Sequence, residues 1–399
     1  PAGDGSRPAA GTGRMMGTSR TGPVGVAVVG CGSVSRHYLR TLRWFEVLEV
    51  VACADIDPAR AKSRVAEFGL GRPATVEDVL ADDAVEVVVN LTPPTAHAHI
   101  TRMCLSAGRS VYSEKPLAPT WTEGRELVAL AEQRGLLLAC APDTMLGRGV
   151  QTVRHLMESG AIGQPIYAQA TFAVAGHEVW HPDPQYYYLP GAGPLWDMGP
   201  YYLSLLISLL GPITSVQAHE TRSPRVRQVA TGPQRGARVR VETPTTSMAL
   251  LRFTSSAAAT LVCSFDGWAT AAPRLEVQGS DAAVLAADPN TFGGPVHMAT
   301  GTSAGWSEVD LVEGYDLERG IGVADLAAAV RHGGQPRASA ELALHVVEVM
   351  AAVASSSATG GRTVPVNGRP VVPPLVPDLS TYGWTPPDPT IDARYAVVV

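Results

Sequence analysis

The fold is decided by the stretch Val24-Gly25-Val26-Ala27-Val28-Val29-Gly30-Cys31-Gly32-Ser33-Val34-Ser35. Residues 24–29 form a short, β-branched apolar run, which is typical of a buried parallel strand. A glycine-rich turn follows and opens onto a segment, 34–43, with the periodicity of a helix. A strand, such a turn and a helix in this order predict the first βα unit of a dinucleotide-binding domain.

The turn has the form G-x-G-x-x-S, and each of its small residues has a physical reason. Gly30 permits the tight turn, and Gly32 lets the backbone approach a pyrophosphate without a Cβ in the way. At the helix N-terminus, the free N–H groups near Ser33 and Val34 would bind the anion. Ser35 is small enough to replace the third glycine. The alternative is an ordinary tight turn, but the position after a strand and before a helix favours the dinucleotide.

An acidic residue, Asp55, ends the next predicted strand, 47–54, where the fingerprint requires one. Its carboxylate would accept hydrogen bonds from the adenosine ribose and repel a 2′-phosphate, which favours NAD over NADP. Ile56 lies beside it in the expected cofactor site. Arg60 keeps NADP open as the second choice.

Two patterns divide the chain into two predicted domains after a flexible leader at residues 1–22. Residues 23–143 alternate apolar runs with amphipathic stretches, which predicts an α/β Rossmann domain with a doubly wound parallel sheet. Residues 144–360 place strands next to one another, which predicts an α+β domain with a large, mostly antiparallel open sheet. Its expected elements are a helix at 148–159, strands at 164–174, 213–220, 240–254, 257–266, 273–278 and 282–287, and helices at 320–332 and 340–354. The Pro-rich tail, 361–399, is expected to lie over the surface or a partner subunit.

Composition excludes several classes of function. The chain has 31 Lys and Arg against 37 Asp and Glu, without a basic block, which argues against nucleic acid and anionic membranes. The five cysteines are scattered and odd in number, as in a protein of a reducing compartment, and we expect a cytoplasmic location. The longest apolar stretch, residues 201–210, is too short to span a bilayer.

Three motifs together resemble the glucose-fructose oxidoreductase, inositol dehydrogenase and MocA (Gfo/Idh/MocA) family. They are Gly30-Cys31-Gly32-Ser33, Thr92-Pro93-Pro94-Thr95-Ala96-His97 and Glu114-Lys115-Pro116-Leu117. The likeness covers residues 24 to about 355. It implies a Rossmann domain joined to an α+β domain whose open sheet forms a homodimer or homotetramer interface. It further implies a catalytic role for Lys115, contacts of Thr92, Pro93 and His97 with the nicotinamide or its ribose, and room for a cis bond before Pro116.

The residues themselves support part of this picture. In a doubly wound sheet the carboxyl ends of the strands face the ligand crevice, so Asn90 and its neighbours should meet Glu114 and Lys115 there. A lysine at that place can stabilise an alkoxide, or shuttle a proton if burial lowers its pKa. The alternative is a solvated surface pair, Glu114 and Lys115, beside a turn.

A second-domain segment, Gly191 to Tyr202, departs from the family pattern. The family carries an Asp and, four residues later, a His at the start of a helix; here Asp197 matches the acid, but Tyr201 stands where the His is expected. Positions four apart share a helix face, so both could reach a substrate hydroxyl beside Lys115. A phenol serves as a base near neutral pH only if a cation such as Lys115 lowers its pKa.

The loop from Gly176 to Tyr188 offers another base and a sugar-binding surface. His181 is the second candidate acid/base, and His177, Trp180 and Tyr186 are expected to contact substrate, because aromatic rings beside polar groups suit a sugar. Packing or a subunit contact is the alternative for the tyrosines. A zinc site is not favoured, because a fourth ligand is not evident. Asp143 is also expected to line the pocket.

These features predict an NAD-dependent oxidoreductase that moves a hydride between nicotinamide and a secondary hydroxyl or keto group of a sugar, polyol or glycoside. Lys115 and Asp197 would organise the proton transfer, with Tyr201 or His181 as acid/base. One alternative is a glycoside-cleaving enzyme that retains its NAD through oxidation, elimination and re-reduction. The other is a non-catalytic, NAD-binding regulatory protein.

Overall fold

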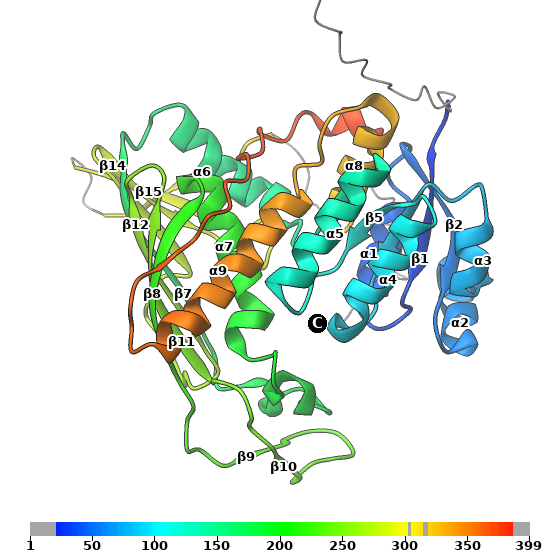
Figure 1. The fold of residues 1–399 in the computed structure, drawn as a ribbon. Coiled ribbons are helices and arrows are strands. Elements are labelled where there is room, and N and C mark those ends of the chain that lie inside the picture. Colours follow the sequence, from blue (N-terminus) through cyan, green and yellow to red (C-terminus); the bar gives the residue numbers. More distant parts are fainter. Residues whose placement is uncertain (1–20, 302–304, 314–317, 386–399) are drawn as a thin grey trace, which may run out of the picture.

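The computed structural model describes residues 21–301, 305–313 and 318–385. Two sheets lie on opposite sides of the molecule, with helices α5 (Trp121–Arg134), α7 (Pro194–Leu210) and α9 (Ala340–Ala358) between them (Figure 1). Most of the expected leader, residues 1–20, and the end of the expected tail, residues 386–399, lie outside the described part.

The N-terminal sheet is parallel and has the strand order of a Rossmann domain, as the sequence predicts. Its strands, in spatial order, are β3 (Arg72–Ala74), β2 (Leu48–Ala54), β1 (Val24–Val29), β4 (Val87–Asn90), β5 (Ser110–Ser113) and β6 (Leu138–Cys140). Its connecting helices are α1 (Ser35–Leu42), α2 (Pro58–Phe68), α3 (Val76–Ala81), α4 (Pro94–Ser106) and α5 (Trp121–Arg134). All residues of β1, β4, β5 and β6 are buried, which explains their unbroken apolar runs. The sequence analysis missed β3 and α3.

The second sheet is mixed and mostly antiparallel, in agreement with the expected fold class. Its order is β16 (Ser307–Val309), β15 (Val296–Thr300), β14 (Ala282–Ala286), β13 (Leu275–Gly279), β7 (Pro165–Ala173), β12 (Ala258–Ser264), β11 (Thr246–Phe253), β8 (Ile213–Thr221) and β17 (Val364–Pro365). Only the β7 and β12 pair is parallel among these described strands. A separate hairpin of β9 (Arg227–Gln228) and β10 (Arg238–Val239) projects away from the sheet (Figure 1). The expected strand at 240–254 begins only at Thr246, and β9, β10, β15, β16 and β17 were not predicted.

One face of this sheet is covered by α6 (Arg148–Glu158), α7 (Pro194–Leu210) and α9 (Ala340–Ala358). Alternate residues of β11 point into this core, while Met248 and Leu250 point away from it and are about half exposed. Ile166 and Tyr167 of β7 are about half exposed as well. By length and composition alone, α9 could cross a membrane, but it packs against β8, α5 and α7 as a core helix does.

Of the two C-terminal segments, helix α8 lies differently from the expectation, and the described part of the tail lies over the surface as one of the two expected alternatives has it. Helix α8 (Ile321–His332), assigned by sequence to the second domain, packs against β1, β5 and β6 of the Rossmann sheet. The tail crosses this chain's own surface: β17 pairs with β8, and Trp384 forms a β-bridge with Phe45 beside the Rossmann sheet. The described part of the tail therefore joins the two domains.

Candidate active site

A cavity of about 560 Å³ lies at the carboxyl ends of the Rossmann strands and is closed on its far side by the second domain. The Rossmann domain contributes eleven of the thirteen expected cofactor residues to its wall: Gly30, Gly32, Ser33, Val34, Asp55, Arg60, Thr92, Pro93, His97, Glu114 and Lys115. The second domain contributes Tyr186, Tyr187, Trp196, Asp197, Tyr201 and Arg319, among others. The two sets meet at Lys115 and Asp197.

The glycine-rich turn has the shape that a pyrophosphate requires. Gly30 has φ +99°, and a Cβ there would lie 2.6 Å from the Leu91 backbone. At Gly32 a Cβ would meet no atom within 4 Å, so open space faces this backbone. The Ser35 hydroxyl donates a hydrogen bond of 2.7 Å to the Gly32 carbonyl and fixes the turn at the start of α1. These residues fit a dinucleotide phosphate.

The acidic end of the cavity is held in place by backbone contacts. Asp55 Oδ2 accepts a hydrogen bond from the Cys31 N–H at 2.7 Å, and Oδ1 accepts one from the Asp57 N–H at 2.9 Å. Arg60 lines the cavity nearby, while the Ile56 side chain is fully exposed and is not among the lining residues.

The T-P-x-x-x-H motif is connected to the E-K-P motif through His97. Its ring nitrogens lie 2.7 Å from the Thr92 carbonyl oxygen and 2.9 Å from the Pro116 carbonyl oxygen. The Lys115–Pro116 peptide bond is cis. Asn90 is fully buried below the cavity, where its amide donates to the His97 carbonyl at 3.1 Å. Among these residues Asn90 therefore supports the motif and does not line the cavity.

An ion pair between Lys115 and Asp197 joins the two domains at the centre of the site. Lys115 Nζ lies 3.0 Å from Asp197 Oδ1 and donates at 2.7 Å to the Asp197 carbonyl oxygen. Burial works to lower the pKa of Lys115, but the charge of Asp197 outweighs it and the pKa lies above its usual value. Burial likewise works to raise the pKa of Asp197, but Lys115 and a hydrogen bond from His177 hold it well below the usual range. Of the two roles considered for Lys115, the proton shuttle required a pKa lowered by burial, and this condition is not met because the buried partner of Lys115 is an anion.

His177 provides a contact that the sequence did not reveal. It lies in a 3₁₀ turn, His177–Val179, between β7 and α7, and its Nε2 is 2.8 Å from Asp197 Oδ2. The Asp197 carboxylate is thus held by Lys115 on one oxygen and by His177 on the other. The helix position where the family has a histidine is Tyr201 in this chain, and a loop histidine, His177, contacts Asp197.

Tyr201 lies between two cations. Lys115 Nζ is 5.2 Å and Arg319 Cζ 5.6 Å from the centre of its ring, and Arg319 Nη2 donates a 3.0 Å hydrogen bond to the phenol oxygen. Sequence analysis missed Arg319, which stands just before α8 and far from every motif. Its one signal is that it directly precedes the glycine at the start of a predicted helix.

Arg319 also faces the acidic side of the site. Burial works to raise the pKa of Glu114, but the charges of Arg319 and Lys115 outweigh it and hold the pKa below its usual value. The Tyr38 hydroxyl donates a 2.8 Å hydrogen bond to the same carboxylate. Glu114 is therefore an ionised, buried partner of the two cations.

Four predicted substrate residues are not among those that line the cavity: His177, which contacts Asp197 instead, and Asp143, Trp180 and His181. Asp143 is fully buried, and its Oδ2 accepts hydrogen bonds from the Gly320 and Gly322 N–H groups at the start of α8. Trp180 is exposed, and His181 Nδ1 accepts a 3.0 Å hydrogen bond from the Asp183 N–H. Tyr186, in contrast, lines the cavity.

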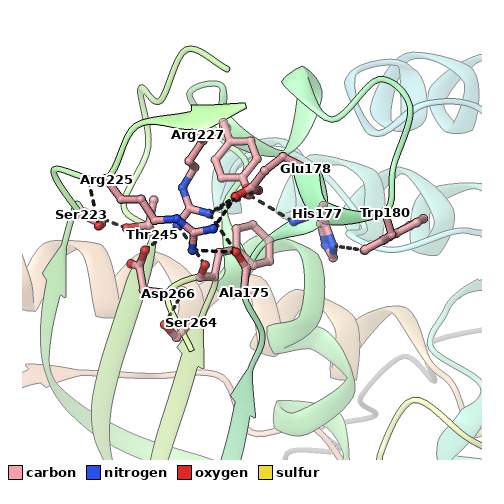
Figure 2. Close-up of polar contacts among 12 residues, drawn as sticks. Ala175, His177, Glu178, Trp180, Ser223, Arg225, Arg227, Thr245, Ser264 and Asp266 are labelled. Carbon is pink, nitrogen blue, oxygen red and sulfur yellow. Dashed lines mark hydrogen bonds and ion pairs between the residues drawn. The ribbon is translucent and has the colours of Figure 1, made fainter. Parts of the chain in front are cut away.

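The loop that carries His177 is anchored by a buried arginine, as Figure 2 shows. Arg227 reaches from β9 and donates hydrogen bonds to Glu178 Oε1 at 2.7 Å and to the Phe265 carbonyl at 2.9 Å. The Tyr188 hydroxyl donates to Glu178 as well. Glu178 and His177 therefore point to different partners.

In the described part of the chain, no group of three or more His, Cys, Asp and Glu side chains is arranged to hold a metal.

The coupled pKa shifts predict a pH window for the ion pair. A carboxyl whose pKa is lowered by folding stabilises the protein at any pH above its unfolded-state pKa. This stabilisation is lost as the pH falls through its folded-state pKa. A lysine whose pKa is raised by folding loses its stabilising contribution only in strong base. Asp197→Asn should lower the free energy of unfolding by about 3 kcal/mol between about pH 5 and pH 9, and the difference should shrink in acid. Urea unfolding across this range measures it. Glu77→Gln, at an exposed site, is the control, and a difference that grows toward acid would contradict the assignment.

Comparison with known proteins gives the family directly. Residues 24–141 match the model of an oxidoreductase family with an NAD-binding Rossmann fold, and residues 150–285 match the Gfo/Idh/MocA C-terminal domain. Together the two models cover more than half of the chain.

Similar proteins include sugar-related enzymes. A dTDP-3,4-didehydro-2,6-dideoxy-alpha-D-glucose 3-reductase from Saccharopolyspora spinosa is 32% identical over 50% of this chain and 61% of its own. D-apiose dehydrogenase from Paraburkholderia graminis is 27% identical over 49% and 52%. The chain spans about half the length of the first curated relatives that it matches. The structure of levoglucosan dehydrogenase superposes with a TM-score of 0.74 at 19% identity, over 87% of this chain and 99% of that one, which shows a shared fold.

With both domain models matched in the expected order, the chain belongs to the Gfo/Idh/MocA family of oxidoreductases.

Proposed function

We propose that the protein is an NAD-dependent dehydrogenase or reductase acting on a secondary hydroxyl or keto group of a sugar, polyol or glycoside. The observation that carries this proposal is the charged Lys115, held by Asp197 at the point where the dinucleotide cavity meets the second domain. The similarity to D-apiose dehydrogenase and to a dTDP-sugar reductase supports a carbohydrate substrate. The rings of Tyr186, Tyr187 and Trp196 in the cavity wall suit the apolar faces of a sugar.

The chain's own residues can assist the reaction by charge and by proton transfer. A bound nicotinamide would exchange a hydride with the carbinol carbon. Lys115 has three N–H donors, of which two point to Asp197, so a third is available to a substrate oxygen. That contact strengthens as negative charge develops on the oxygen, and so stabilises the transition state.

Tyr201 is the proposed acid/base. Because Arg319 already donates to the phenol oxygen, the hydroxyl proton of Tyr201 is left to point toward another acceptor. The two cations beside the ring stabilise the phenolate that forms when this proton leaves. In the oxidising direction, the Tyr201 oxygen would take up the proton of the substrate hydroxyl, and in the reducing direction it would return that proton.

Two further proposals concern location and assembly. All five cysteines are unpaired and buried, which supports a reducing compartment such as the cytoplasm.

We infer that the outer sheet face around Met248 and Leu250 binds a second copy of this chain, because it carries a contiguous apolar groove of about 460 Å³. In a twofold dimer this face would be buried against itself.

The dimer proposal predicts a change of mass in solution. Leu250→Glu places a charge on the apolar face and should convert dimer or tetramer to monomer in light scattering, because a buried unpaired carboxylate opposes association. Glu77→Lys, on an exposed helix of the other domain, should leave the mass unchanged. A wild-type monomer would refute the proposal.

The cofactor proposal predicts a preference that calorimetry can measure. NAD should bind at least tenfold more tightly than NADP, a difference of about 1.4 kcal/mol, because Asp55 favours a ribose diol over a phosphate. Asp55→Ala should narrow the gap mainly by weakening NAD. Equal affinities in the wild type would contradict the proposal.

The function itself is tested by Lys115→Ala. With NAD and a panel of sugars and glycosides, this variant should lose about a hundredfold or more in turnover while it keeps its NAD affinity, because one electrostatic or acid/base group is removed. Normal turnover would remove Lys115 from the mechanism. Mass analysis of the purified wild type is a companion measurement, since tightly held NAD with cleaved glycoside and no net reduction would favour the cofactor-retaining route.

The choice of acid/base is tested by a matched pair of variants. Tyr201→Phe removes only the phenol oxygen and should slow turnover about a hundredfold or more, while His181→Ala should have a small effect. The expected order follows from geometry, since Tyr201 lines the cavity and His181 is not among its lining residues. A mild Tyr201→Phe with a severe His181→Ala would reverse the assignment.

A further inference from the structure

Both ring nitrogens of His177 have defined partners. Nε2 faces Asp197 Oδ2 at 2.8 Å, and Nδ1 receives the indole N–H of Trp180 at 3.1 Å. The ring is buried and packs edge-on against Tyr187 and at a tilt against Phe265, with centroids 4.2 and 4.6 Å away. Its orientation is therefore fixed by packing as well as by hydrogen bonds.

The contact with Trp180 identifies the protonation state of the ring. An indole nitrogen can only donate, so Nδ1 of His177 must accept and cannot carry a proton. The single imidazole proton then resides on Nε2, from which it is donated to the Asp197 carboxylate. Protonating Nδ1 would set two N–H groups against each other and break the contact with Trp180.

The loop that carries His177 and Trp180 is held in place by buried hydrogen bonds and ion pairs. The Arg227 side chain is completely buried and is bonded to Glu178, which directly follows His177 in the 3₁₀ turn. It is also bonded to Asp266 and to the Ala175 carbonyl, at the ends of neighbouring strands (Figure 2). The Tyr188 hydroxyl contacts both Glu178 and the His177 N–H. These contacts keep the imidazole directed at Asp197.

We propose that Trp180 is a positioning residue that holds His177 as the neutral Nε2–H tautomer, so that His177 orients the Asp197 carboxylate and does not serve as the base for the substrate. The catalytic part of this inference rests on the proposed function. The loop histidine is thereby separated from the acid/base step, because its one lone pair is occupied by the indole and its one proton by Asp197. Proton transfer is left to Tyr201, whose ring centre lies 5.2 Å from Lys115 Nζ.

A pair of substitutions at His177 separates orientation from base catalysis. Glutamine offers an amide N–H to Asp197 but cannot take up a proton, whereas leucine offers neither. His177→Gln should stay within about tenfold of wild-type turnover, and His177→Leu should lose about a hundredfold or more. Equal, severe losses in both variants, with unchanged melting temperatures, would overturn the proposal, since that is the behaviour of a lost base.

Trp180 is tested by removing its N–H alone. Trp180→Phe should lower kcat about three- to tenfold with little change in KM, because the substrate contacts remain while the orientation of Asp197 loosens. Trp306→Phe, beside the edge strand β16, is the matched control and should behave as the wild type. An unchanged kcat in Trp180→Phe would refute its positioning role.

The tautomer can be read without turnover. In protein labelled with ¹⁵N-histidine, with His177→Gln used for assignment, the His177 signals near neutral pH should show a protonated Nε2 and an unprotonated Nδ1. Trp180→Phe should shift the Nδ1 signal, and Trp306→Phe should not. A wild-type His177 protonated on Nδ1 overturns the inference, and this result is independent of whether any sugar is a substrate.

Discussion

The arrangement of the site depends on one buried ion pair between the two domains. Lys115 comes from the end of a Rossmann strand and Asp197 from the first turn of α7, and neither could be buried alone without a large desolvation cost. The pair holds the second domain against the Rossmann domain at the cofactor cavity. The same pair keeps both groups charged, which turns a buried lysine into a permanent cation in the place where an alkoxide would form.

Charges around this pair are balanced by residues from distant parts of the chain. Glu114 and Arg319 form a second opposite-signed set beside it, and Tyr201 lies between the two cations. Neutral His177 adds a directed dipole without adding a charge. The site thus places several fixed charges around Lys115, an arrangement that suits the proposed reaction because negative charge would develop on the substrate oxygen there.

The sequence predicts the Rossmann half well because its signals are local. Strands such as β1 are continuous apolar runs, and the glycine turn and Asp55 follow them at fixed spacing. Short exposed strands such as β3 carry no such pattern, and β9 and β10 have only two residues each. The candidate site was less predictable, because proximity in space decides it. His177 and His181 lie in the same polar loop, and the sequence does not show which of them faces Asp197; the 3₁₀ turn directs His177 there. Arg319 donates to Tyr201 although more than a hundred residues separate the two in the chain.

The C-terminal segment has a mechanical consequence. Between β17 and Thr385 it bonds first to the second sheet and then to Gln151 and Arg154 of α6. At its end it bonds to Trp44 and Phe45, in the connection between α1 and β2 of the Rossmann domain. The segment thus crosses the surface from the second domain to the Rossmann domain and is bonded to both. A wide hinge motion would have to break these bonds together, at a cost that grows with each one. These bonds therefore oppose a wide opening of the cavity in which the Rossmann domain and the second domain meet.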